Sequence, residues 1–185
     1  MAPLEGAVGF LKEMYSKVMT PSGSVDNVMR VHSLRPQTMN GHYTLYKSVL
    51  HHEDISLPLW YLEAIAVYTS ILNSCAYSLK HHYSNFEKLH GNTEWCQSLY
   101  RALEVGTPEK VLNGKELALM RYAGKLTKNP GTMIEEDVLT VRREGATDEE
   151  ILEVNQVCAY FNYSNRTLNG LGVSTEGDAI GYYQE

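Results

Sequence analysis

The feature that most limits how this chain can fold is the apolar segment from Leu59 to Leu72. Its apolar stripe consists of Leu59, Leu62, Ile65, Ala66, Thr69 and Leu72, which recur at helical spacing. The preceding Ser56-Leu-Pro58 places a proline just inside the start of a helix, where proline is favoured. A stripe this wide predicts a buried central helix, around which the rest of the chain must pack.

Helical patterns continue through most of the remaining chain, and no segment convincingly predicts a strand. A short helical turn is expected from Asp26 to Val31. Further helices are expected at Gly9–Val18, Pro36 to about His51, Cys75 to about Leu89, Thr93 to about Glu104, Lys115–Leu126, Glu135–Arg143 and Ile151–Leu168. The sequence therefore predicts a single all-α domain over residues 1–185 with about eight helices.

Local signals set several of the expected helix ends. Asn73 or Ser74 would stop the central helix and cap the next one. Gly91 suits a C-cap, and Thr147 begins a capping box before the last helix. The tail, residues 174–185, is polar with two glycines and is expected to be loose or docked on a partner subunit.

Charge and composition exclude several classes of protein. The net charge is -6 and no basic run occurs, so nucleic acid is not expected as a partner. The first ten residues lack the pattern of a signal peptide, and no segment approaches the roughly 18 apolar residues of a membrane span. Three widely spaced cysteines, Cys75, Cys96 and Cys158, fit a reducing compartment. The expected location is cytoplasmic, without membrane association.

A candidate reactive group lies in the segment from Asn73 to His82. Cys75, Ser78 and His82 are three and four residues apart, which places them on one face of a helix. In the first turn of that helix, the Cys75 thiol would have a lowered pKa and act as a nucleophile. The alternatives are a small buried cysteine, a serine bonded to a backbone carbonyl, and a surface histidine.

Glu63 is an acid inside an apolar run. It is either a solvent-facing residue or a buried carboxylate that bonds to His82 and orients its ring. The pairs His51-His52 and His81-His82 show no metal-ligand spacing, so no metal site is expected.

Three other residues carry reactive or charged groups outside this segment. Cys96 and Cys158 have no accompanying motif and are expected to be structural. Arg166 would anchor an anion or pair with an acid for structure.

The chain resembles the alkylhydroperoxidase D (AhpD) and carboxymuconolactone decarboxylase family, most closely its "uncharacterized peroxidase-related" branch. The family motif is a glutamate, then twelve residues on a Cys-x-x-Cys, and a histidine four residues after the second cysteine. Glu63, Cys75, Ser78 and His82 occupy these positions. Other segments within residues 8–175 also resemble that branch: Asp26-Asn-Val, Ala118 to Pro130, and Tyr160-Phe-Asn-Tyr-Ser-Asn-Arg166 through Gly170-Leu-Gly172-Val.

The resemblance implies an AhpD-like orthogonal helix bundle that assembles as a trimer or hexamer. It also implies an oxidoreductase that reduces alkyl hydroperoxides, with a proton relay from Glu63 through His82, a thiol reductant protein and no cofactor. In the redox members both cysteines are needed, and the second reacts with peroxide. Here that position holds Ser78, and Tyr77 stands where some members have a histidine.

Three hypotheses about Ser78 follow. In the first, the protein is a thiol-dependent antioxidant enzyme or its relic. Ser78 is then either an engineered Cys→Ser trap or a native loss of peroxidase function. Alternatively, Ser78 is native and functional, and the site performs non-redox decarboxylase, isomerase or hydrolase chemistry on a small organic acid. Cys75 would then be nucleophile or acid, with Glu63 and His82 as the base. The third hypothesis is a catalytically silent oligomeric binding protein.

Overall fold

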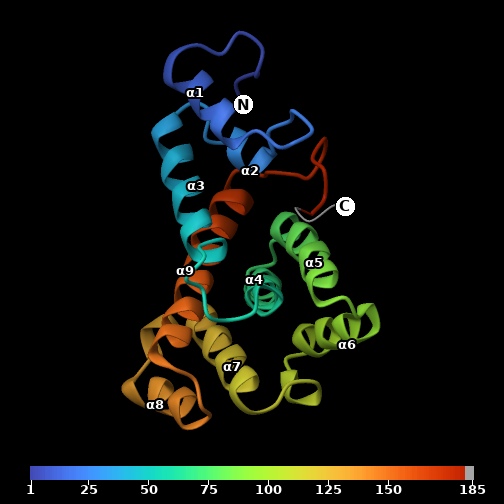
Figure 1. The fold of residues 1–185 in the computed structure, drawn as a ribbon, viewed down its shortest axis with the longest axis vertical. Helices are drawn as coiled ribbons and strands as arrows, with labels where there is room; N and C mark the ends of the chain where they lie inside the picture. Colours follow the sequence, from blue (N-terminus) through green and yellow to red (C-terminus); the bar gives the residue numbers. More distant parts are fainter. Residues whose placement is uncertain (182–185) are drawn as a thin grey trace.

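The computed structural model describes residues 1–181, and residues 182–185 lie outside the described part. The described residues form nine α-helices, two short 3-10 helices and no strand (Figure 1), which confirms the all-α prediction. The helices are α1 (Gly9–Val18), α2 (Asn27–Arg30), α3 (Pro36–Leu50), α4 (Leu59–Leu72), α5 (Ala76–His90), α6 (Thr93–Glu104), η1 (Pro108–Lys110), α7 (Gly114–Lys128), η2 (Pro130–Thr132), α8 (Glu135–Arg143) and α9 (Asp148–Gly170). Across residues 1–181, no helix combines the length and apolar character needed to cross a membrane.

Helix α4 is the centre of the main core. It packs against α5, α6, α7 and α9, and Figure 1 shows it end-on in the middle of the bundle. Every residue from Tyr61 to Ser70 is buried, including Glu63. The expected buried central helix is therefore confirmed. Its position follows from apolar side chains on nearly all of its faces, because such a helix is stable only when it is enclosed.

The N-terminal helices form a second, smaller core. Its buried side chains are Met14, Tyr15, Val18, Val25, Met29 and Met39, which come from α1, α2, α3 and the loop before α2. Figure 1 shows these three helices at one end of the molecule, beside the C-terminal half of α9. The arrangement places α2 and α3 opposite α5, with α9 joining the two cores.

The junction between α4 and α5 differs from the expectation. Asn73 ends α4, and Ser74 has a left-handed backbone with φ of 52°. Cys75 is the extended N-cap of α5, with φ of −98° and ψ of 91°. The expectation that Asn73 or Ser74 caps α5 and that Cys75 lies in its first turn is therefore wrong. Because Ser74 adopts the left-handed conformation, the chain turns at this residue and α5 begins only at Ala76.

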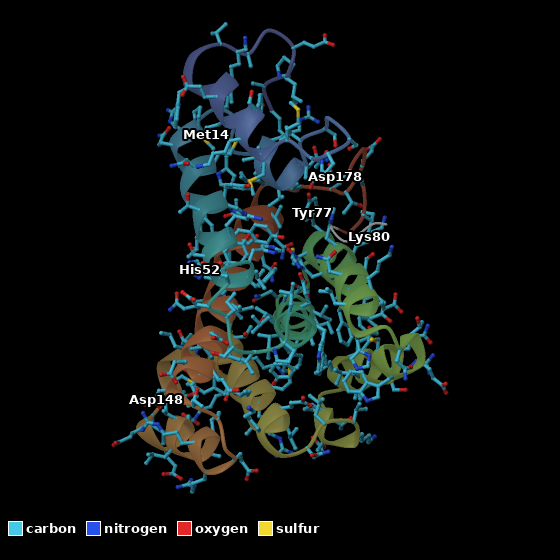
Figure 2. All side chains as sticks on the ribbon, in the orientation of Figure 1. Met14, His52, Tyr77, Lys80, Asp148 and Asp178 are labelled. Carbon is cyan, nitrogen blue, oxygen red and sulfur yellow. The ribbon has the colours of Figure 1, made fainter. Side chains whose placement is uncertain are left out.

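The described part of the C-terminal tail docks on its own chain, contrary to the expectation of a loose or partner-docked tail. The Asn27 side chain donates to the carbonyl oxygens of Ser174 at 3.1 Å and Glu176 at 2.9 Å. The Asn27 backbone N–H donates to the Asp178 carboxylate, which also accepts from the Tyr77 hydroxyl. Figure 2 shows Tyr77 and Asp178 close together where the tail meets α5. These partly buried bonds explain the docking of residues 174–178.

Candidate active site

Glu63 and His82 form the hydrogen-bonded pair that the sequence predicted. The Glu63 side chain is fully buried, and its Oε2 accepts a hydrogen bond from Nδ1 of His82 at 2.6 Å. Its Oε1 accepts from the Asn85 side-chain amide at 3.1 Å. Because Nδ1 carries the proton of this bond, a neutral His82 ring has its free lone pair on Nε2. The pair is therefore arranged as a base with an orienting carboxylate.

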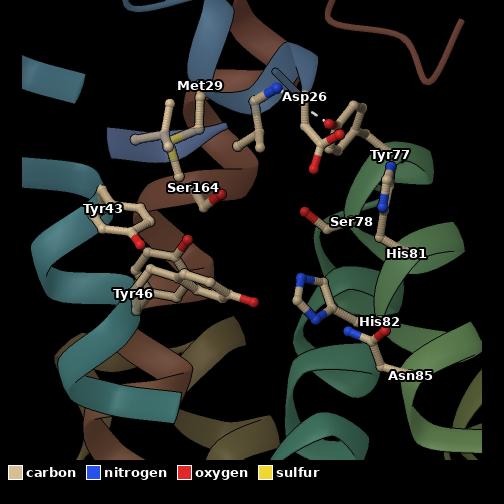
Figure 3. A pocket seen from close by; sticks show the side chains of 13 residues that line it. Asp26, Met29, Tyr43, Tyr46, Tyr77, Ser78, His81, His82, Asn85 and Ser164 are labelled. Atoms are coloured by element: carbon tan, nitrogen blue, oxygen red, sulfur yellow. Dashed lines mark hydrogen bonds between the residues drawn. The ribbon is translucent and has the colours of Figure 1, made fainter. Parts of the chain in front are cut away.

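The His82 ring borders a cavity between α3 and α5 (Figure 3). Its volume of about 60 Å³ has room for a few water molecules or a small ligand. The lining residues are Val18, Asp26, Val28, Met29, Tyr43, Tyr46, Tyr77, Ser78, His81, His82, Asn85, Tyr160 and Ser164. Hydroxyl, imidazole and carboxyl groups thus meet apolar side chains in one small space.

Cys75 lies behind the wall of this cavity. It is 1% exposed and packs in a small cluster with Tyr77, Leu168 and Val28. Tyr77 and Val28 also line the cavity, whereas Cys75 is not among the residues that line it. Ser78 and His82 line the cavity, whereas Cys75 is the N-cap of α5 and does not lie in its first turn. The structure brings Glu63, Ser78 and His82 together and sets Cys75 apart.

A second polar cluster, which the sequence reasoning did not find, borders the same cavity. The Tyr77 hydroxyl donates to Oδ2 of Asp178 and accepts from the Val28 backbone N–H at 3.1 Å. Burial and the nearby Asp178 raise the pKa of Asp26 to about 6. Burial, with the neighbouring His82 as a smaller cause, lowers the pKa of His81 to about 4. The Asp26-Asn-Val segment was the one sequence signal that pointed here.

The wall on the other side contains a buried tyrosine–histidine pair. The Tyr160 hydroxyl bonds to Nε2 of His42 at 2.9 Å, and Tyr160 lines the cavity. Burial, with His32 as a smaller cause, lowers the pKa of His42 to about 3. Tyr160 begins a segment that carries the family resemblance, but no motif pointed to its pairing with His42, which lies 118 positions away in the sequence.

The remaining candidates lie away from the cavity. Burial raises the pKa of the Cys96 and Cys158 thiols, to about 11 for Cys96, which makes both weak nucleophiles. Arg166 is exposed and donates to the backbone and side-chain oxygens of Asn162 on its own helix, and it forms no ion pair within residues 1–181.

Comparison with curated proteins finds distant relatives, while no family model matches the sequence. Sestrin-2 of Mus musculus and Sestrin-2 of Homo sapiens are each 24% identical to this chain over 180 residues, which is 96% of the chain. The match covers 35% of each relative, so the chain spans about a third of their length.

Solved structures share the fold more clearly. An uncharacterized peroxidase-related protein with an AhpD core from Ralstonia eutropha JMP134 superposes with a TM-score of 0.80 at 21% identity, covering 96% of this chain and 90% of that one. An uncharacterized peroxidase-related protein from Silicibacter sp. TM1040 gives 0.78 at 21% identity, with 99% and 92% covered. The debrominase Bmp8 gives 0.71 at 18% identity, with 90% and 86% covered. The chain therefore has the AhpD-like fold.

Proposed function

We propose that this chain is a peroxidase-related oxidoreductase that reduces small hydroperoxides with Cys75 as the reacting thiol. The observation that carries the proposal is the buried hydrogen bond from His82 to Glu63 beside a cavity of about 60 Å³. The likeness of the fold to peroxidase-related proteins supports the same reaction class. The small cavity favours hydroperoxides with few heavy atoms.

The proposed reaction begins when His82 removes the proton of the Cys75 thiol, with Glu63 stabilising the charged ring. The thiolate attacks the terminal oxygen of the hydroperoxide, the O–O bond breaks, and Cys75 becomes a sulfenic acid while the alcohol leaves. Ser78 offers no second thiol to form a disulfide. An external thiol therefore condenses with the sulfenic acid and releases water, and a second thiol restores Cys75.

The reaction also requires the cavity wall to move. Cys75 is buried in a cluster with Tyr77 and Val28, which line the cavity, and Val173 of the C-terminal segment packs on the same cluster. Opening of this cluster would give the thiol access to the cavity and to His82. Segments held by a few hydrogen bonds open more easily than a packed core, and the segment that contains Val173 is of this kind.

The test measures peroxide consumption with a dithiol reductant and follows Cys75 by mass spectrometry. We expect a sulfenic acid on Cys75, loss of turnover in Cys75→Ala, and faster turnover in Ser78→Cys, which restores a thiol pair. The control is Cys96→Ser with Cys158→Ser, which should keep turnover. Turnover that persists in Cys75→Ala would exclude the proposal.

One observation favours a second function. Ser78, not Cys75, lines the cavity with His82, which suits hydrolase-type or isomerase-type chemistry on a small organic acid. Among the structures with this fold, a cysteine-to-alanine variant of the debrominase Bmp8 holds 2,3,4-tribromopyrrole, a small ring compound. Turnover without any reductant, lost in His82→Ala and retained in Cys75→Ala, would identify this second function.

Assembly and location stay predictions. The resemblance implies a homotrimer or homohexamer, a thiol reductant protein as a partner and a cytoplasmic location. A thiol reductant fits the proposed reaction, because Cys75 needs an external thiol to return to its reduced state.

A further inference from the structure

Asp26 lies on the cavity wall at the start of α2, and the relay from Glu63 to His82 does not use it. Figure 3 shows its carboxyl group and the His82 ring on either side of the Ser78 hydroxyl in this view. Within residues 1–181, Oδ1 of Asp26 is buried and has no hydrogen-bond partner. A buried carboxyl oxygen without a partner is costly while the group is charged, so this environment favours the protonated acid.

The neighbouring carboxylate explains which acid holds the proton. Asp178 is 3% exposed and accepts hydrogen bonds from the Asn27 backbone and the Tyr77 hydroxyl. These donors stabilise an ionised carboxylate, so of the two acids Asp26 and Asp178 it is Asp178 that carries the negative charge. Burial and this charge together raise the pKa of Asp26 to about 6. Asp26 can therefore hold a proton, and donate it, in mildly acidic solution up to about pH 6.

We propose that Asp26 is a catalytic acid of this cavity, which protonates the oxygen that leaves when a hydroperoxide reacts. The inference rests on the proposed function and identifies the group that gives a proton to the departing alcohol oxygen. Two separate groups on the wall of one cavity suit this division, because a base and an acid are needed at different atoms of the substrate.

The proton balance assigns one step to each group. His82 takes the proton of the Cys75 thiol, and the thiolate bonds to the terminal oxygen, which keeps its hydrogen. The O–O bond breaks with its electron pair going to the inner oxygen, and Asp26 gives that oxygen its proton. The products are a sulfenic acid, an alcohol, an Asp26 carboxylate and a protonated His82. Transfer of the His82 proton to Asp26 through cavity water restores both groups.

Several titratable groups surround Asp26 and set the expected pH dependence. Tyr77 and His81 face it from α5, Asp178 from the C-terminal segment, and Arg30 follows one turn later on α2. His81 has a pKa of about 4 and is neutral at the relevant pH. An acid must be protonated to act, so acid catalysis by Asp26 should decline as pH rises through about 6.

The test compares two oxidants that differ in their leaving group. The leaving oxygen of tert-butyl hydroperoxide becomes an alcohol and needs a proton, whereas peracetic acid releases a stable carboxylate. In Asp26→Asn, the rate of Cys75 oxidation by tert-butyl hydroperoxide should fall about 100-fold, because general acid catalysis contributes at least that much. The rate with peracetic acid should stay unchanged. Asp26→Glu, which keeps the acid, should recover most of the rate.

Controls make the outcome decisive. Asp148→Asn removes an exposed carboxyl on α9 and should match the wild type with both oxidants. If Asp26→Asn loses equal rate with both oxidants, or with neither, Asp26 is not the acid and the proposed function still stands. A wild-type protein that reacts with neither oxidant would overturn the proposed function and the role of Asp26 together.

Discussion

Glu63 is held inside the apolar helix α4 by hydrogen bonds from His82 and Asn85. A carboxylate that is fully buried is stable only when such donors replace its lost water. Both donors lie on the adjacent helix α5, one turn apart, so a single helix face satisfies both oxygens. The bond orients the His82 ring toward the cavity.

Glu63→Gln tests the charge without removing the side chain. The introduced amide oxygen can still accept from His82, while the Asn85 amide can flip to accept from the new NH₂ group, so the fold should persist. We expect the rate of Cys75 oxidation to fall roughly 10- to 100-fold, because loss of an orienting partner typically costs that much. Stopped-flow kinetics and a thermal melt measure both quantities. Glu149→Gln, on the exposed side of α9, is the control; equal rates in both variants would contradict the relay.

The family resemblance implied the pairing of Glu63 with His82, whereas the residues alone left Glu63 either solvent-facing or bonded to His82. Helical spacing placed Ser78 and His82 on one face of α5, but it wrongly put Cys75 in the first turn of that helix. The placement of Cys75 assumed that the helix already included it. The helix is interrupted at Ser74, a non-glycine residue with positive φ. A serine side chain does not predict this conformation.

At the scale of elements, helix ends that carry strong local sequence signals could be predicted, whereas the docking of the C-terminal tail could not. Gly91 ends α5 with φ of 76°, and Thr147 forms the capping box of α9, both as the sequence indicated. The docking of the tail depends on Asn27 and Asp178, which are 151 positions apart. Local patterns contain no information about such a contact. The same limit hid the role of Tyr77, whose hydroxyl joins the tail to α5.

Weakening the C-terminal segment should expose Cys75. Asn27→Ala removes two hydrogen bonds to the segment that covers the Cys75 cluster. Their loss, at about 0.5–1.5 kcal/mol each, should speed labelling of Cys75 by a thiol reagent roughly tenfold. Labelling is measured in a background of Cys96→Ser and Cys158→Ser.

Asn92→Ala is the matched control for that experiment. Asn92 caps α6 through the Trp95 backbone N–H, far from the tail in sequence, and its loss costs about 1 kcal/mol of stability. It should leave the labelling rate unchanged under native conditions. Equal labelling of Asn27→Ala and wild type would show that the segment does not control access to Cys75.

At the scale of the whole molecule, buried histidines link stability to pH. The pKa of His42 falls to about 3, and the pKa values of His51 and His81 fall to about 4, in each case chiefly because burial disfavours the charged ring. His81 lines the cavity, His42 bonds to the lining residue Tyr160, and the His51 ring contacts the lining residue Tyr46. In the folded protein these histidines therefore stay neutral at pH values where the same histidines in the unfolded chain would bind protons.

The free energy of unfolding should fall as the pH drops below about 6.5, the ordinary pKa of histidine. A histidine with a lowered folded pKa gives its full stability above that pH and loses it as the pH falls toward the folded pKa. Asp26, whose pKa is raised from 3.8 to about 6, acts in the opposite direction between these two pH values. Burial also lowers the pKa of His32, so four histidines against one aspartate leave a net loss of stability in acid.

His42→Gln isolates the largest of these contributions. Without His42, the slope of unfolding free energy against pH should decrease by up to about 1.4 kcal/mol per pH unit between pH 6 and 4, the value for one proton. Urea unfolding at a series of pH values measures the slope, and the glutamine can still accept from Tyr160. His52→Gln, which alters a histidine with 56% side-chain exposure, should leave the slope unchanged. Identical slopes in His42→Gln and wild type would mean that His42 is not held neutral by the fold.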